Sequence, residues 1–126
     1  IDEGLVGSEM CIRDSTNSEY PSPEENLNLN CITTLSERFN LPVGYSGHEP
    51  SVSPSLIAAC LGATAIERHI TKDRSSYGSD QAASLEEVGL KSLVDMVRKI
   101  PVVLGDGIKT ITDQEKNIAK KLRYWL

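Results

Sequence analysis

The sequence predicts an α/β fold in which parallel strands alternate with helices. Short apolar runs typical of β-strands recur along the chain, and each is followed by a segment with helical periodicity. Strand–helix–strand units of this length form right-handed crossovers and build a parallel sheet. An open doubly wound sheet and a (β/α)8 TIM barrel both fit this order. The first is disfavoured, because no glycine-rich dinucleotide or phosphate loop follows a strand.

Residues 1–15 show neither helical nor strand periodicity. They resemble the translation of sequencing-adapter read-through, so we expect a non-native, disordered leader and exclude it from the fold prediction. A disordered native leader is the alternative. The remaining residues 16–126 carry 14 acidic and 12 basic side chains. This near balance, with no basic patch, excludes nucleic acid as an expected partner.

The first expected elements are the end of a strand at 17–20 and a helix after it. Ser22-Pro23-Glu24-Glu25 supplies an N-cap, a proline at the first helical position and a glutamate at the third. The helix should bury one stripe of apolar side chains, which are Leu29, Ile32, Leu35 and Phe39.

Two more strands follow, at 41–46 and 63–69, with a helix between them. Ser53-Pro54 opens that helix and Gly62 ends it. Cys31 and Cys60 fall in helical contexts, so we expect free, reduced thiols in a cytoplasmic protein.

The last third of the chain contains a loop and two helices. A polar loop spans 71–83, and Ser84-Leu85-Glu86-Glu87 reads as a capping box. The helix after it should turn five residues inward, namely Val88, Leu90, Leu93, Val94 and Val97. Thr112-Asp113-Gln114-Glu115 is another capping box, opening a basic helix that should end near Trp125. No apolar run approaches the roughly 20 residues of a membrane span, so no membrane partner is expected.

Length bears on the architecture. A (β/α)8 barrel typically needs about 250 residues, and three strands cannot close one. We therefore expect residues 16–126 to be the C-terminal part of a TIM barrel, about its last three strand–helix units, plus a C-terminal helix.

His48 and His69 each end a predicted strand. If the strands are adjacent and parallel, both imidazoles emerge at one rim, and strands about 4.8 Å apart let both reach one metal at about 2.1 Å. Two neutral histidines with water or substrate oxygens suit Mn²⁺, Fe²⁺, Co²⁺ or Zn²⁺. The alternative is that both rings only form hydrogen bonds where loops begin.

Other polar residues lie near the same rim. Glu67 shares a strand face with His69 and is either a partner of that ring or an acid of the barrel interior. Asp80 on the long loop could accept sugar hydroxyls or simply cap a turn. Ser18 and Ser46 could donate to a carboxylate or phosphate, although serine is common at strand ends.

Several stretches, in order and spacing, resemble the sialic acid synthase (N-acetylneuraminate synthase) family. The resemblance covers nearly all of residues 17–107. Its parts are Asn17 to Pro23, Leu41 to Glu49, Leu61 to Ala63, Glu67 to Thr71, Gly78 to Asp80 and Ala83 to Glu86.

The resemblance implies a (β/α)8 barrel that condenses phosphoenolpyruvate with an N-acylated mannosamine-type sugar and releases phosphate. It also implies three pairs of site residues: His48 and His69 as metal ligands, usually for Mn²⁺; Tyr20 and Asp80 for the sugar; and Ser18 and Ser46 for phosphoenolpyruvate. The acid and base residues are expected in a missing N-terminal part, so the isolated chain should be inactive and only marginally folded.

The resemblance further implies a homodimeric parent protein. Whether that parent carries an antifreeze-like C-terminal domain is left open. So is the exact sugar, since synthases for legionaminic or pseudaminic acid are close alternatives. A non-catalytic α/β binding module is the alternative from a different functional class.

Overall fold

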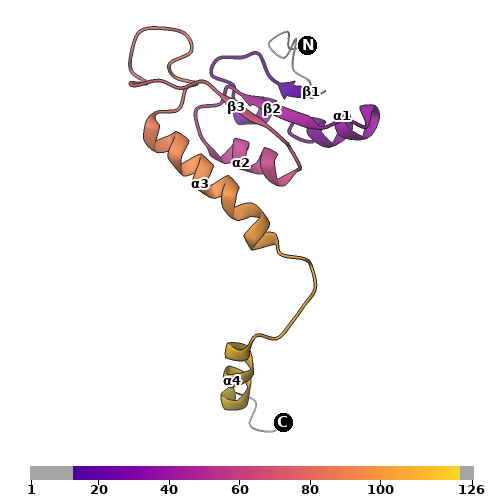
Figure 1. Ribbon diagram of the computed structural model, residues 1–126. Helices are drawn as coiled ribbons and strands as arrows, with labels where there is room; N and C mark the ends of the chain where they lie inside the picture. The colour runs from indigo at the N-terminus through magenta and orange to yellow at the C-terminus, as the bar shows by residue number, and fades with distance from the viewer. Residues whose placement is uncertain (1–12, 123–126) are drawn as a thin grey trace.

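The structure is a computed structural model that describes residues 13–122 (Figure 1). Its centre is a three-stranded parallel sheet in the order β1-β2-β3. The strands are β1 (Arg13–Thr16), β2 (Val43–Gly47) and β3 (Ile66–Arg68). The predicted α/β fold with a parallel sheet is confirmed.

Strand β1 falls almost entirely within residues 1–15, for which the sequence predicts no regular structure. Its residues pair in register with Val43 to Ser46 of β2. Residues 17–20, predicted as the end of a strand, form a loop instead. The strand prediction for 17–20 is therefore wrong, and residues 13–15 are not disordered. Residues 1–12 of the predicted leader lie outside the described residues, and the origin of that leader stays a prediction.

The helix expected after Ser22 is divided into two elements. A 3₁₀-helix, η2 (Glu24–Asn26), precedes α1 (Cys31–Phe39). Asn28 between them has a φ of 45°, in the left-handed region that interrupts a helix. The prediction of one continuous helix is wrong for this reason, and Phe39 is 44% exposed instead of buried.

The next unit follows the prediction closely. Helix α2 (Ser53–Cys60) begins with a proline in its first turn. Gly62 follows it with a φ of +102°, which favours glycine. Strand β3 is shorter than the predicted run 63–69, although the Ala65 carbonyl still accepts a hydrogen bond from the Tyr45 N–H at 2.9 Å.

Helix α3 (Glu87–Leu104) begins three residues after the predicted cap. Ser84 is buried, and its Oγ donates to the backbone oxygen of Asp80 at 2.6 Å, so it closes the loop instead of capping the helix. Leu93 is buried as expected, whereas Val88, predicted to face inward, is 82% exposed.

The last helix, α4 (Asp113–Leu122), has the predicted capping box. The Glu115 N–H donates to Thr112 Oγ1 at 3.2 Å, and the Thr112 N–H donates to Glu115 Oε2 at 2.8 Å. Trp125, the predicted end of this helix, lies outside the described residues.

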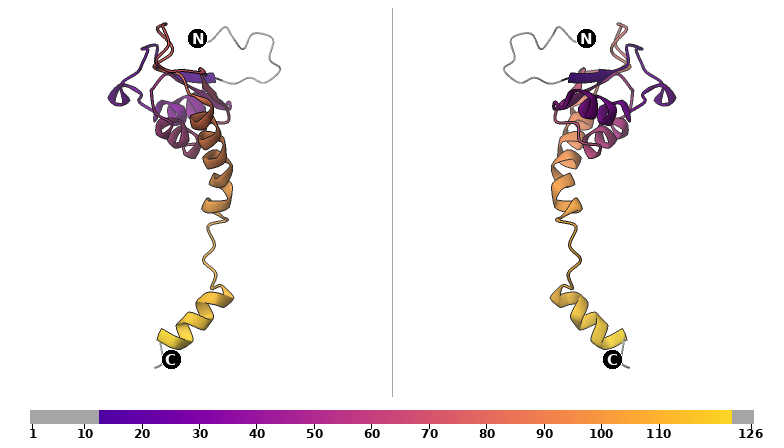
Figure 2. Two further views of the ribbon diagram at one scale, coloured as in Figure 1. Left: turned by 90° about the vertical axis from the view of Figure 1, so that its left-hand side faces the viewer. Right: turned by 90° about the vertical axis from the view of Figure 1, so that its right-hand side faces the viewer.

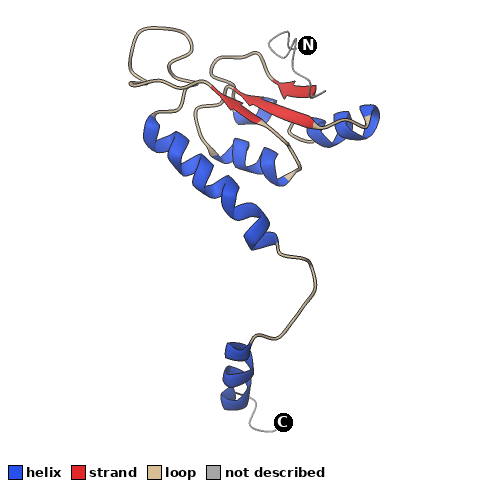
Figure 3. Cartoon of the chain, in the orientation of Figure 1, coloured by secondary structure: helices blue, strands red, loops and turns tan. Residues whose placement is uncertain are grey.

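Helices α1 and α2 lie on the same side of the sheet (Figure 3). Their contact with it forms the core, made of Ile32, Val43, Tyr45 and Ala58. Helix α3 packs against α2 and then leads away from the sheet, and an extended segment separates it from α4 (Figure 2). Within residues 13–122, none of the helices combines the length and the apolar character needed to cross a membrane.

Candidate functional site

Two imidazoles meet at the carboxyl end of the parallel sheet. His48 directly follows β2, and His69 directly follows β3. The two strands are neighbours and run in the same direction, so their carboxyl ends lie at one edge. The ring centroids of His48 and His69 are 5.3 Å apart, with their planes inclined at 54°. The structure thus brings together the two histidines that the sequence singled out.

The ring of His48 is fixed by the loop that follows β1. His48 is 6% exposed, and its Nδ1 lies 2.7 Å from the backbone oxygen of Asn17. A carbonyl oxygen can only accept, so Nδ1 carries a proton in this contact, and in the neutral ring Nε2 then keeps its lone pair. The Ser22 N–H donates to the His48 carbonyl at 3.0 Å, which holds the backbone as well. Sequence reasoning missed the Asn17 carbonyl, because a backbone acceptor leaves no trace in residue type.

The backbone of His69 is held by the segment that precedes α3. The Leu85 N–H donates to the His69 carbonyl at 2.8 Å, and the Thr71 N–H donates to the Leu85 carbonyl at 2.9 Å. These bonds close the base of the loop at 71–83. The position of His69 therefore does not depend on the path of that loop.

Tyr20 is the third aromatic ring of this cluster. Its centroid is 4.1 Å from that of His48 and 5.9 Å from that of His69, and it meets His69 edge-on. Tyr20 is still 43% exposed, so one face of the cluster is open to solvent. We call Tyr20, His48 and His69 the aromatic cluster.

The other predicted site residues occupy separate positions. Ser46 is half-buried and pairs in register with Thr16 and Glu67, so these three residues share one face of the sheet. Ser18 is exposed on the loop after β1. Asp80 is exposed on the loop at 71–83, where its Oδ1 accepts from Ser79 Oγ at 3.1 Å. Of the six predicted residues, three form the aromatic cluster and three do not belong to it.

A buried polar network next to the cluster was missed by sequence reasoning. The Glu49 carboxylate lies 3.2 Å from Arg68 Nη1 and accepts a hydrogen bond from the Tyr45 hydroxyl at 2.9 Å. Burial lowers the pKa of the Arg68 guanidinium, and the Glu49 charge opposes that shift. Burial also raises the pKa of the Tyr45 hydroxyl, and the nearby Glu49 carboxylate raises it further. The only available signal was position, since these charges flank the histidines in the chain.

The spacing of the two rings is compatible with a divalent metal held by two imidazoles. Rings bound to one ion through nitrogens at about 2.1 Å have centroids no more than about 6.6 Å apart, and the observed separation is 5.3 Å. The tautomer of His48 also fits, because a ligating histidine typically donates its other N–H to a carbonyl or carboxylate. Across residues 13–122, no group of three or more His, Cys, Asp or Glu could hold a metal. The remaining ligands would then be water or substrate oxygens.

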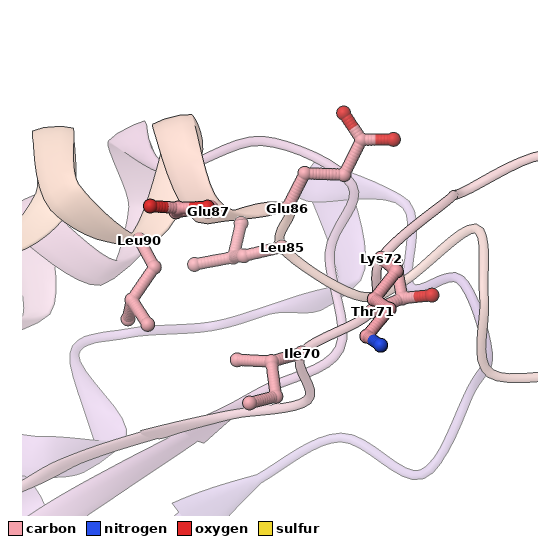
Figure 4. Close-up of a pocket in the computed structure, with 7 residues that line it drawn as sticks. All are labelled: Ile70, Thr71, Lys72, Leu85, Glu86, Glu87 and Leu90. Atoms are coloured by element: carbon pink, nitrogen blue, oxygen red, sulfur yellow. The ribbon is translucent and has the colours of Figure 1, made fainter.

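A separate cavity of about 640 Å³ lies at the start of α3 (Figure 4). In Figure 4, Ile70, Leu85 and Leu90 form its apolar side, and the Glu86 carboxylate points away from them. Its lining includes none of the six predicted site residues. This cavity is therefore distinct from the aromatic cluster at the strand ends.

Comparisons with known proteins agree with the resemblance found in the sequence. The chain is 42% identical over 107 residues to the N,N'-diacetyllegionaminic acid synthase of Campylobacter jejuni, covering 82% of this chain and 32% of that protein. It is also 42% identical over 106 residues to the N-acetylneuraminate-9-phosphate synthase of Homo sapiens, covering 83% and 30%. The chain therefore spans about a third of the length of these relatives.

A solved structure supports the fold. The N-acetylneuraminic acid (sialic acid) synthetase of Leptospira borgpetersenii, in complex with citrate, superposes with a TM-score of 0.69 and 33% sequence identity. The match covers 89% of this chain and 40% of that one. The family model described as the NeuB family matches residues 7–109, which includes part of the segment set apart as a leader. The chain belongs to the NeuB family.

Proposed function

We propose that this chain carries the metal-binding part of a synthase that joins phosphoenolpyruvate to N-acetylmannosamine or a related sugar and releases phosphate. The proposal is supported by the family and by relatives named as synthases of sialic and legionaminic acids. The observation that carries it is the 5.3 Å separation of the His48 and His69 rings at the ends of adjacent strands.

The architecture belongs to the same proposal. Strands β1 to β3 are proposed to be three neighbouring strands of a (β/α)8 barrel. The parallel order and the helices between strands agree with this arrangement. In such a barrel, the face shared by Thr16, Ser46 and Glu67 would turn inward, and the aromatic cluster would lie at the catalytic end.

The two imidazoles are proposed to hold a divalent ion, most simply Mn²⁺. When bound, such an ion supplies a positive charge to the aldehyde oxygen of the open-chain sugar, where negative charge builds as the new carbon–carbon bond forms. His48 would bind through Nε2, because Asn17 engages its Nδ1. The carbonyl partner orients the ring and makes it a better ligand.

The remaining residues are proposed to place the two substrates. Tyr20 stands against both histidines and would cover one side of the sugar, while Asp80 would accept sugar hydroxyls from the loop at 71–83. Ser18 and Ser46 would donate hydrogen bonds to phosphoenolpyruvate. Their positions near the ends of β1 and β2 allow these roles.

The proposed function leaves two candidates for the sugar substrate. The chain is 42% identical to a legionaminic acid synthase and 42% identical to an N-acetylneuraminate-9-phosphate synthase. A legionaminic acid synthase is therefore the second candidate.

A chimera tests both candidates. The segment of the Campylobacter jejuni relative that aligns with this chain is replaced by the corresponding residues of this chain. Phosphate release is measured with phosphoenolpyruvate, Mn²⁺ and one of three sugars: N-acetylmannosamine, its 6-phosphate or the six-carbon precursor of legionaminic acid. We expect turnover with one sugar, and its loss in His48→Ala and His69→Ala. A folded chimera whose bound metal is unchanged by either substitution would instead favour a non-catalytic module.

A further inference from the structure

The side chains of Glu49 and Arg68 form a buried ion pair beside the aromatic cluster. Glu49 follows His48 in the chain, and Arg68 precedes His69. Arg68 Nη1 lies 3.2 Å from Glu49 Oε1, and the two side chains are 2% and 0% exposed. The pair therefore connects the same two strand ends that carry the imidazoles.

The Arg68 guanidinium donates hydrogen bonds to backbone carbonyls near both strand ends. Its Nη1 donates to the Ser51 carbonyl at 2.8 Å, and its Nη2 donates to the backbone oxygen of Glu49. Nη2 also donates to the Ala83 carbonyl at 3.3 Å, in the segment that precedes α3. One planar group thus fixes the loop after β2 and the base of the loop after β3.

The Glu49 carboxylate is held from three directions. Oε2 accepts from the Tyr45 hydroxyl at 2.9 Å, and Oε1 accepts from Ser55 Oγ at 3.0 Å as well as from Arg68. Tyr45 belongs to β2, Ser55 to α2 and Arg68 to β3. The carboxylate is therefore a fixed point between three elements of the fold.

Gly47 provides the space for this carboxylate. A Cβ atom at Gly47 would lie 2.6 Å from Glu49 Oε2 and 2.9 Å from the Cδ of Arg68. Gly47 is also the register partner of Arg68 across the two strands. The ion pair is thus packed directly against the backbone from which His48 emerges.

Stability alone is a weak reason for such a pair. The cost of removing two charges from water offsets much of their attraction, so a buried pair adds little net stability. The pair instead fixes geometry, because each of its hydrogen bonds holds one backbone or side-chain group in place. The two charged residues that make these hydrogen bonds are the sequence neighbours of His48 and His69.

We infer that Glu49 and Arg68 are positioning residues that set the separation of the His48 and His69 rings. The inference rests on the proposed function, because that separation matters for a shared metal. The ion pair itself touches neither metal nor substrate in this account. Its effect reaches the rings through the backbone at the ends of β2 and β3.

The test uses the full 126-residue chain and two conservative variants, Glu49→Gln and Arg68→Lys. Asp95→Asn is the matched control, since it removes an exposed ion pair in which Lys91 Nζ lies 2.7 Å from Asp95 Oδ2. One readout needs no metal: nuclear Overhauser contacts among the rings of Tyr20, His48 and His69. The other is the Mn²⁺ dissociation constant, measured by electron paramagnetic resonance. Far-UV circular dichroism reports whether each variant folds.

We expect Glu49→Gln and Arg68→Lys to weaken the contact between the two imidazoles and to raise the Mn²⁺ dissociation constant at least tenfold. Asp95→Asn should leave both readouts unchanged within twofold. Folded variants that keep the ring contacts and the metal affinity overturn the inference. If neither variant folds, Ser55→Ala decides. It keeps both charges but removes the hydroxyl that donates to Glu49 Oε1 at 3.0 Å and accepts from Arg68 Nη1 at 3.1 Å. Ser55→Ala should raise the Mn²⁺ dissociation constant about threefold. If both the ring contacts and the dissociation constant stay unchanged, the inference is overturned.

The two readouts separate this inference from the proposed function. If the unmodified chain binds no Mn²⁺ but Glu49→Gln alters the ring contacts, the metal role fails and the positioning role stands. If Mn²⁺ binding is lost in His48→Ala but unchanged in folded Glu49→Gln, the positioning role fails alone. An unmodified chain that lacks the ring contacts contradicts both.

Discussion

The Nδ1 atom of His48 lies 2.7 Å from the backbone oxygen of Asn17, so the loop after β1 determines which nitrogen of this ring is free. The two ring nitrogens of His48 therefore have different roles. Nδ1 holds the loop, and Nε2 is available to a ligand.

His48→Asn and His48→Ala should therefore differ. The asparagine amide can take the place of Nδ1–H and keep the bond to Asn17, but it has no group at the position of Nε2. We expect His48→Asn to lose metal binding while retaining stability. His48→Ala should lose both, with an additional cost of about 1 kcal/mol for the missing hydrogen bond. Urea unfolding and Mn²⁺ titration of the two variants check this, and equal unfolding midpoints would contradict it.

The Glu49–Arg68 pair predicts strong coupling between two substitutions. Arg68→Met leaves the Glu49 carboxylate buried without its partner, which should lower the free energy of unfolding by about 3–5 kcal/mol. In the double variant Glu49→Leu/Arg68→Met no charge remains buried, so the loss should be smaller than the sum of the single losses. Urea unfolding of the three variants measures the coupling. Strict additivity would show that the two side chains do not interact.

Two glycines provide a matched comparison of steric effects. A Cβ at Gly47 would meet Glu49 Oε2 at 2.6 Å, so Gly47→Ala should destabilise the chain by about 1–3 kcal/mol. The nearest atom to a Cβ at Gly89 in α3 lies at 3.7 Å. Gly89→Ala should stabilise by about 0.5–1 kcal/mol, because alanine favours a helix. The midpoint of thermal unfolding should fall in Gly47→Ala and rise in Gly89→Ala. A higher midpoint in Gly47→Ala would refute the packing described.

The capping box of α4 predicts a pH dependence. The Thr112 N–H donates to the Glu115 carboxylate and holds the pKa of that carboxyl below its usual value. A lowered pKa in the helical state means that the ionised form stabilises the helix. This stabilisation is complete above the ordinary glutamate pKa of about 4.3. It is lost as the pH falls through the lower pKa of the capped state.

Carbon-detected NMR titration of the Glu115 carboxyl checks this directly. The control is Thr112→Gly, which removes the Oγ1 acceptor of the Glu115 N–H. It should loosen the turn and bring the Glu115 pKa closer to that of an ordinary glutamate. Identical titration curves in the two chains would show that the capping box does not form in solution.

The sequence predicted the convergence of the two histidines better than it predicted the element boundaries. His48 and His69 could be located because each ends an apolar run, and the ends of adjacent parallel strands meet at one edge. Strand β1 could not be located, because its hydrogen bonds with β2 involve only the backbone and its four residues show no apolar alternation. The start of α3 was misjudged because Ser84 bonds to Asp80 across the loop.

The buried ion pair shows a second limit of sequence reasoning. Charged residues are almost always exposed, so residue type gave no reason to place Glu49 and Arg68 in the interior. Their burial depends on the hydroxyl groups of Tyr45 and Ser55, which come from two other parts of the chain. Such a network becomes visible only when the strands and helix are assembled.

The most direct test of the account asks whether both histidines bind one ion. Zn²⁺, a diamagnetic substitute for Mn²⁺, is titrated into the chain labelled with ¹⁵N in its histidine rings. We predict that the ¹⁵N resonances of one nitrogen in each ring shift together and that both saturate at one equivalent of Zn²⁺. The affected atom of His48 should be Nε2. Shifts of only one ring, or saturation of the two rings at different equivalents, would contradict the account.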